Sequence, residues 1–389
     1  AGVATAGALT VNQLSGGAAG SGATTISIRP DILADTSATG LGSGFAAWFP
    51  TTGIRPLTAA ELAQGLYRPI STNANVSVSG TQTVGTATVN SLTMNAGGKI
   101  NIISTGATFT DSTGGFLALE NSAGSVSGGL FSTGGNQAFF FQQDTTNALD
   151  FNAYLLTSNQ IIKAGLGTMN LLKPQVFQQQ FTIFNMLGGT LNLNSGVNNT
   201  LPVVSTATTP YVTSLLLNNG LVDLKGNNQV LGNLYTNNAI AGAGGVITNS
   251  SGTLATLTSA YAASQSFAGS ITGNLAFTRS GNNTTTLTNT NSYNGATIVR
   301  GGVLELKDQG ALTATTSLTD YFGTLQLNDQ GLNSGINRLA TTVPLTLAGA
   351  TLNYLGNQTS ASVGTVNVSA GQSVVSVSTM TGNVAVSGL

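Results

Sequence analysis

Short runs in which apolar and polar residues alternate recur along this chain, and many of them follow glycine. Residues 97–102, 188–193 and 301–306 each place a glycine pair before such a run. Glycine reaches backbone conformations that other residues avoid at tight corners, and alternation sends every second side chain to the same face of a strand. The pattern therefore predicts short β-strands joined at glycine corners, with one face packed and one face in water.

One spacing indicates how these strands are arranged. Residues 304–310 and 325–331 share the pattern Leu-x-Leu-x-Asp-Gln-Gly at a shift of 21 residues. About 21 residues suit one coil of a three-sided parallel β-helix, whose coils stack roughly 4.8 Å apart. We predict an all-β, right-handed parallel β-helix (β-solenoid) with Thr and Asn ladders between coils and loops of uneven length. An antiparallel sandwich of short strands is the alternative.

The two ends of the sequence differ from its middle. Residues 1–75 contain the only Trp, Trp48, and Thr58 followed by Glu61 is a capping-box pattern that predicts a short helix within residues 57–67. We interpret residues 1–75 as an N-terminal cap or docking segment, because an open solenoid end exposes its core. Residues 76–359 are interpreted as the solenoid, and residues 360–389 as Val-rich terminal strands that offer an assembly edge.

Composition narrows the function. Only 23 residues are charged (11 basic and 12 acidic), whereas about a quarter is usual, and the basic residues form no run. We therefore expect neither nucleic acid nor a membrane span. The chain has no Cys and no His, which removes disulfides and the usual general base and metal ligand. We predict a protein that is not an enzyme and uses no cofactor.

Residues 286–306 run through an Asn-Ser-Tyr-Asn-Gly turn at 291–295 and end on Gly-Gly-Val-Leu-Glu-Leu. This stretch resembles the autotransporter-associated β-strand repeat, also called the passenger-associated transport repeat. A more diverged copy, without that turn, spans residues 167–193. Residues 45–59 and 89–92 are similar to segments that precede such repeats in very large secreted bacterial proteins. The resemblance implies a parallel β-helix, secretion with the signal peptide removed, and a role at the cell surface or in the extracellular matrix.

Three functions remain open at this point. The first is a structural rod that polymerises through its ends into a filament, sheath or surface layer. The second is an adhesin that binds polysaccharide or another cell through an outward strand face or through a loop such as residues 134–150. The third is a glycan-degrading β-helix enzyme, for which the charged candidates are Glu305, Lys307, Asp308 and Asp329.

Asp308 and Asp329 have two further interpretations. Asp-Gln-Gly suits a turn, in which the Asp side chain accepts backbone N–H groups and Gly takes the left-handed position. Alternatively, the two carboxylates could stack on neighbouring coils with a calcium ion between them.

Apolar residues outside the expected core are candidates for assembly contacts. In a strand over residues 139–141, the middle ring faces opposite to its neighbours, so at least one ring should point outward. The assembly candidates are Trp48, Phe140, Val374, Val384 and Val386.

Overall fold

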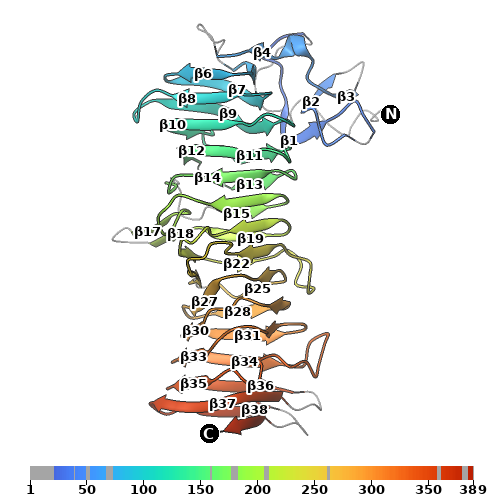
Figure 1. Ribbon diagram of the computed structural model, residues 1–389. Helices are drawn as coiled ribbons and strands as arrows, with labels where there is room; N and C mark the ends of the chain where they lie inside the picture. The colour runs from blue at the N-terminus through green and yellow to red at the C-terminus, as the bar shows by residue number, and fades with distance from the viewer. Residues whose placement is uncertain are drawn as a thin grey trace. The chain divides into compact units, whose positions relative to one another are not determined.

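A computed structural model describes residues 22–38, 40–49, 53–66, 73–157, 160–176, 183–205, 210–260, 263–356, 361–378 and 384–388. The chain divides into two compact units, Ala1–Thr182 with Leu187–Leu191 and Ile183–Met186 with Asn192–Leu389. Each unit is built of parallel strands that pair from one coil to the next, so the predicted β-solenoid is confirmed (Figure 1).

The first unit begins with an antiparallel sheet and continues as coils. Its elements are β1 (Arg29–Ala34), β2 (Gly44–Phe49), β3 (Gly53–Pro56), the 3₁₀ turn η2 (Ala59–Glu61), β4 (Ala63–Gln64), β5 (Asn75–Val78), β6 (Thr81–Val84), β7 (Ala87–Met94), β8 (Lys99–Ile102), β9 (Thr108–Ala118), β10 (Ser125–Ser132), β11 (Ala138–Gln142), β12 (Leu149–Leu156), β13 (Ile161–Ala164) and β14 (Thr168–Leu171). Residues 134–150 were suggested as a loop for adhesion. They are not a single loop, because strand β11 lies within them.

The N-terminal sheet β1–β3 packs on the side wall of the first unit. Phe45 of β2 packs in one cluster with Leu117 of β9, and its ring meets Phe141 of β11 edge-on at 6.3 Å between centroids. Gln143 donates to the Leu41 carbonyl at 2.7 Å. These contacts fit the docking interpretation, and residues 1–21 of the proposed cap lie outside the described residues.

The helix expected within residues 57–67 is only the 3₁₀ turn η2. Glu61 does accept a hydrogen bond from the Thr58 N–H at 2.9 Å, as a capping box requires. Leu62 is already extended, because the next residue, Ala63, pairs in parallel with Val76 of β5. The first coil thus begins inside the segment that the sequence assigned to the cap, and strand pairing ends the helix after one turn.

Five phenylalanine rings form a cluster within the core of the first unit, with the centroids of contacting rings 5.2 to 6.2 Å apart. Such pairs each add about 0.5–1.5 kcal/mol beyond the burial of their surface. Phe140 belongs to this cluster and is 1% exposed, so its assignment as an outward assembly contact is wrong. It faces inward because β11 pairs with β9 in a register that sets Phe140 beside Phe116. The five rings are Phe109, Phe116, Phe131, Phe140 and Phe151.

The second unit, with the strand β16 that has residues in both units, contains the remaining strands. They are β15 (Ile183–Met186), β16 (Thr190–Leu193), β17 (Val203–Ser205), β18 (Pro210–Val212), β19 (Ser214–Leu217), β20 (Leu221–Asp223), β21 (Gln229–Leu231), β22 (Leu234–Tyr235), β23 (Val246–Thr248), β24 (Ala255–Ser259), β25 (Gln265–Phe267), β26 (Ser270–Ile271), β27 (Leu275–Ser280), β28 (Thr284–Leu287), β29 (Thr290–Asn291), β30 (Thr297–Arg300), β31 (Val303–Lys307), β32 (Ala311–Leu312), β33 (Leu318–Tyr321), β34 (Thr324–Asn328), β35 (Leu345–Ala348), β36 (Thr351–Leu355), β37 (Ala361–Ala370), β38 (Val374–Ser378) and β39 (Val384–Gly388).

The register of the second unit matches the sequence repeat. Leu304 pairs in parallel with Leu325, and Leu306 with Leu327, at the predicted shift. A coil such as β30–β31–β32 has three strands, and each pairs with its counterpart in a neighbouring coil. Between β34 and β36 the shift is longer, because Leu325 pairs with Leu352, so loop length does vary from coil to coil.

One corner of the second unit repeats a left-handed residue in successive coils. The residue after β27, β30, β33 and β35, and the residue after β37, all have positive φ. Glycine, which has no Cβ to clash, fills four of these positions. Phenylalanine fills the fifth. The row is Gly281 (φ 96°), Gly301 (φ 77°), Phe322 (φ 56°), Gly349 (φ 65°) and Gly371 (φ 70°).

Candidate functional site

Glu305 is one rung of a polar ladder that crosses four strands, β28, β31, β34 and β36. These strands pair in the register Thr286, Glu305, Gln326 and Asn353. The Thr286 hydroxyl donates to Glu305 Oε2 at 2.6 Å, and Gln326 Nε2 donates to Glu305 Oε1 at 2.7 Å. Asn353 Nδ2 then donates to Gln326 Oε1 at 2.9 Å. The expected ladder between coils is therefore present, with a carboxylate built into it.

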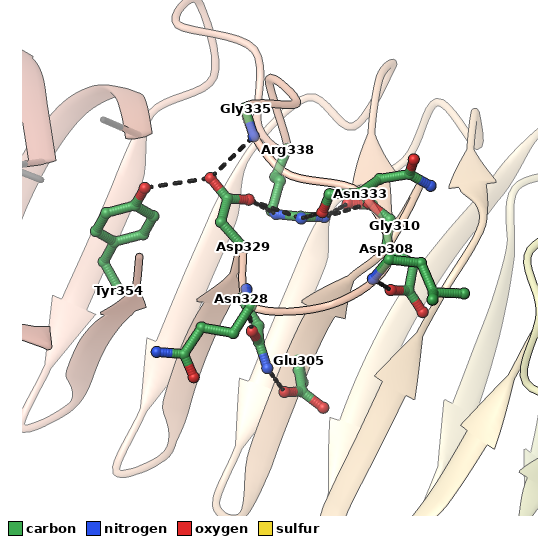
Figure 2. A network of polar contacts seen from close by, with 11 residues as sticks. Glu305, Asp308, Gly310, Asn328, Asp329, Asn333, Gly335, Arg338 and Tyr354 are labelled. Carbon is green, nitrogen blue, oxygen red and sulfur yellow. Dashed lines mark hydrogen bonds and ion pairs between the residues drawn. The ribbon is translucent and has the colours of Figure 1, made fainter. Parts of the chain in front are cut away.

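Donors surround the Glu305 carboxylate on both oxygens. Asn328 Nδ2 adds a second hydrogen bond to Oε1, at 2.6 Å (Figure 2). Burial by itself raises the pKa of Glu305, but the bonds from Asn328, Thr286 and Gln326, together with the charge of Lys307, lower it on balance. Glu305 is thus held as an anion, and Lys307 at the end of β31 assists it through its charge.

Arg338 is the cation between Asp308 and Asp329. It lies in the loop between β34 and β35, is 2% exposed, and contacts Asp329 Oδ1 through Nε at 2.8 Å and Nη2 at 2.7 Å (Figure 2). Its Nη1 donates to the backbone carbonyls of Asp308 at 3.1 Å and Gly310 at 2.9 Å. One guanidinium therefore ties together two neighbouring coils, through the carboxylate of Asp329 in one and the backbone carbonyls of Asp308 and Gly310 in the other.

The two aspartates have different partners. Asp329 Oδ2 accepts from the Tyr354 hydroxyl at 3.2 Å and from the Gly335 N–H at 3.3 Å (Figure 2). Asp308 Oδ1 accepts from the Leu332 N–H at 2.5 Å, a residue of the next coil. The structure brings both aspartates close to Arg338, and their described contacts are with side chains and N–H groups of this chain.

The Asp-Gln-Gly segment is a turn, but glycine has another role there than predicted. Asp308 itself takes the left-handed conformation, with φ 55°, and the Gly310 N–H closes the turn on the Lys307 carbonyl at 2.7 Å. A Cβ on Gly310 would lie 2.0 Å from the Leu287 carbonyl oxygen of the preceding coil. Close approach between coils, rather than backbone angle, requires glycine at this position.

Sequence reasoning missed Arg338. The signal was the longer interval between β34 and β36, since the extra residues form the loop that folds Arg338 back onto Asp329. No motif around Arg338 indicates this contact, because the loop residues beside it, Asn337 and Leu339, carry no repeat pattern.

Other charged side chains are buried without an opposite charge. Burial raises the pKa of Asp320 to about 7; its Oδ1 accepts from the Gly323 N–H at 3.0 Å, and its Oδ2 has no hydrogen-bond partner. Asp111 in the first unit also has an unpartnered Oδ2, and burial raises its pKa well above the ordinary value. Burial lowers the pKa of Lys163 to about 7, while its Nζ donates to the Gly167 carbonyl at 2.7 Å and the Gly188 carbonyl at 2.9 Å.

The remaining assembly candidates lie at the surface to different degrees. Trp48 on β2 is partly buried, and so is Val384 on β39. Val386 on β39 and Val374 on β38 are exposed. Of the five candidates, only Phe140 is in the core.

Two searches of the described residues bear on metals and membranes. Within the ranges described above, no group of three or more acidic side chains is placed to hold a metal ion. No helix in the same ranges has the length and apolar character needed to cross a bilayer.

No protein-family model, curated protein or solved structure matches this chain.

Proposed function

We propose that this chain is a secreted structural protein that self-associates into an extracellular filament, sheath or surface layer. The repeat resemblance of residues 286–306 supports secretion and a surface location, and solenoid coils supply the stiff body that such a role needs. The charged cluster of Glu305, Asp329 and Arg338 supports it too, because its hydrogen bonds join coil to coil.

The observation that carries the proposal is strand β38. It is the last strand of a six-stranded sheet, in which the final three strands are β34, β36 and β38 in that order. Val375 and Val377 continue the inward-facing rows of Leu352 and Tyr354, both of which are fully buried. Yet Val375 is 51% exposed and Val377 is 42% exposed. Among the described residues, β36 is the only strand that pairs with β38 in this sheet, and these two apolar side chains are exposed there.

A second copy of the chain is the occupant that we propose for this surface. An outer strand presents unpaired backbone groups, and a strand from another copy satisfies them while covering the valines. The chain carries a net charge of −1, so little electrostatic repulsion opposes the contact.

Sedimentation velocity over a concentration series, together with negative-stain electron microscopy, tests the proposal. We expect the wild-type chain to form polymers, and the double variant Val375→Lys/Val377→Lys to stay monomeric because charges on an outer strand prevent strand addition. Val197→Lys is the matched control, since Val197 is 50% exposed and lies in the loop after β16, away from β38. A wild-type chain that is monomeric at every concentration, or a double variant that polymerises like the control, contradicts the proposal.

A further inference from the structure

Phe322 breaks the glycine row at the corner of the second unit. It occupies a left-handed position, φ 56°, where the preceding and following coils have Gly301 and Gly349. A bulky residue in this conformation is a true outlier, and such outliers concentrate at functional sites. Glycine would meet the backbone requirement without strain, so the ring itself is the feature that needs a reason.

Packing inside the fold does not supply that reason. The Phe322 side chain is 78% exposed, the largest value among the exposed large hydrophobic residues described. The ring contacts the fold where Gly349 leaves room for it: a Cβ at that position would lie 3.1 Å from two of its ring atoms. One edge of the Phe322 ring therefore lies at the corner, and most of its surface is turned to water.

A second aromatic ring and a cation adjoin Phe322. Tyr321 precedes it and is 37% exposed, and the Arg300 guanidinium of the neighbouring coil lies over the Tyr321 ring at 5.1 Å from its centroid. Arg300 is exposed, and none of the four ion pairs found in the described ranges includes it. The cation is thus positioned by the ring and not neutralised by a carboxylate.

The rest of this face is uncharged, with hydroxyl side chains and the apolar Ile298, which pairs with Thr319. On the strands β27, β30, β33 and β35, the only other charged residues are Arg279 and Asp320, which are both buried. Thr319 lies on the same face of β33 as Tyr321, because side chains two apart in a strand point the same way, and it pairs with Thr346 of β35. The face therefore offers exposed rings, one positive charge and adjacent hydroxyls.

We propose that Arg300, Tyr321 and Phe322 form a binding site for an acidic polysaccharide. A sugar ring has an apolar face that stacks on aromatic side chains, and its hydroxyls bond to Thr side chains such as those beside Tyr321. A uronate carboxylate accepts hydrogen bonds from the Arg300 guanidinium, which has donors in a planar fork. This site is separate from the self-association surface on β38 and does not depend on it.

Binding of a uronate polymer to the full chain tests the site. Polygalacturonate serves as the probe and dextran as the neutral control, with affinity measured by isothermal titration calorimetry and stability by urea unfolding. We expect wild type to bind polygalacturonate and not dextran, with binding that weakens as salt rises. Arg300→Gln should weaken binding at least tenfold.

Phe322→Gly is the decisive variant. It restores the residue found in the other four coils, so we expect its urea midpoint to equal or exceed that of wild type, while polygalacturonate binding falls at least tenfold. A lower urea midpoint with unchanged binding would show that the ring is a structural element packed on Gly349, and would overturn the proposal. Absence of wild-type binding to polygalacturonate overturns it as well. Loss of self-association in Phe322→Gly, with binding unchanged, assigns this face to contact between copies instead.

Discussion

Asp320 on β33 and Asp329, the residue after β34, belong to one coil and are both almost fully buried, yet their surroundings differ completely. Asp329 faces Arg338, and further donors, from Tyr354 and Gly335, reach its second oxygen. Asp320 faces the core with backbone N–H groups on one oxygen and nothing on the other. A paired carboxylate secures a loop against neighbouring coils, whereas an unpaired one disfavours its own charged form.

Two buried residues of the same type, both aspartates, can thus have opposite effects on stability. One stabilises the fold because its charge is paired, and the other destabilises it when charged. The backbone register of β33 aims Asp320 inward, into a row with Val299 and Leu347. The loop after β34 brings Arg338 to Asp329. Three substitutions can break or sharpen this contrast.

Replacing Arg338 should have the largest effect. Arg338→Met leaves the Asp329 carboxylate and the carbonyls of Asp308 and Gly310 buried without their donor, and removing one partner of a buried pair costs about 3–5 kcal/mol. Equilibrium unfolding in urea measures this loss. The double variant Arg338→Met/Asp329→Leu should recover much of the stability, because no charge is then left unpaired. A single variant within 1 kcal/mol of wild type, taking ~1 kcal/mol as the scale of one ordinary hydrogen bond, would refute the pairing argument.

Replacing Asp320 should change stability in the opposite direction. Since burial raises the folded-state pKa to about 7, the folded chain keeps this proton between about pH 4 and about pH 7 while the unfolded chain releases it. The free energy of unfolding is therefore highest below about pH 4. It falls as pH rises from there to about 7, by up to about 1.4 kcal/mol per pH unit.

Asp320→Asn mimics the protonated group and removes this pH dependence. Urea unfolding should show equal stability of variant and wild type at acidic pH, an advantage of the variant that grows through intermediate pH, and its full size at mildly alkaline pH. Asp329→Asn serves as the contrasting control, because it loses the charge that Arg338 requires and should be destabilised. Parallel pH profiles for wild type and Asp320→Asn contradict the assignment.

Replacing Glu305 should have the smallest effect of the three. Glu305→Gln puts an amide donor where one of the carboxylate oxygens accepts, which leaves a donor of Thr286 or of Asn328 unsatisfied, at a cost of about 1–3 kcal/mol. Because the pKa of Glu305 is lowered on folding, its stabilisation is present above the ordinary carboxyl pKa and is lost as pH falls through the folded-state value.

Urea unfolding from neutral to acidic pH measures this effect, and Thr286→Val is the matched variant because it removes a single donor to Oε2. We expect Thr286→Val to lose less stability than Glu305→Gln. Equal stability of Glu305→Gln and wild type at neutral pH would mean that the ladder contributes nothing through its charge.

The sequence by itself determined the coil. Glycine before alternating strands and the repeat at residues 304–310 and 325–331 fix local backbone geometry and a spacing, and both are properties of neighbouring residues. From them follow the parallel β-solenoid, its three-sided coils and the expectation of Thr and Asn ladders between coils, whereas the place of Glu305 in such a ladder came from the structure.

Only the tertiary structure decided which face of each strand points into the core and which loop supplies the partner of a buried charge. Alternation is the same whether Phe140 or its neighbours point inward, and pairing with Phe116 makes the choice. Likewise, the loop after β34 gave no local sign that Arg338 would reach Asp329, because that contact joins residues of different coils. Local patterns set the backbone period, while contacts between coils set where each buried charge and each exposed ring is placed.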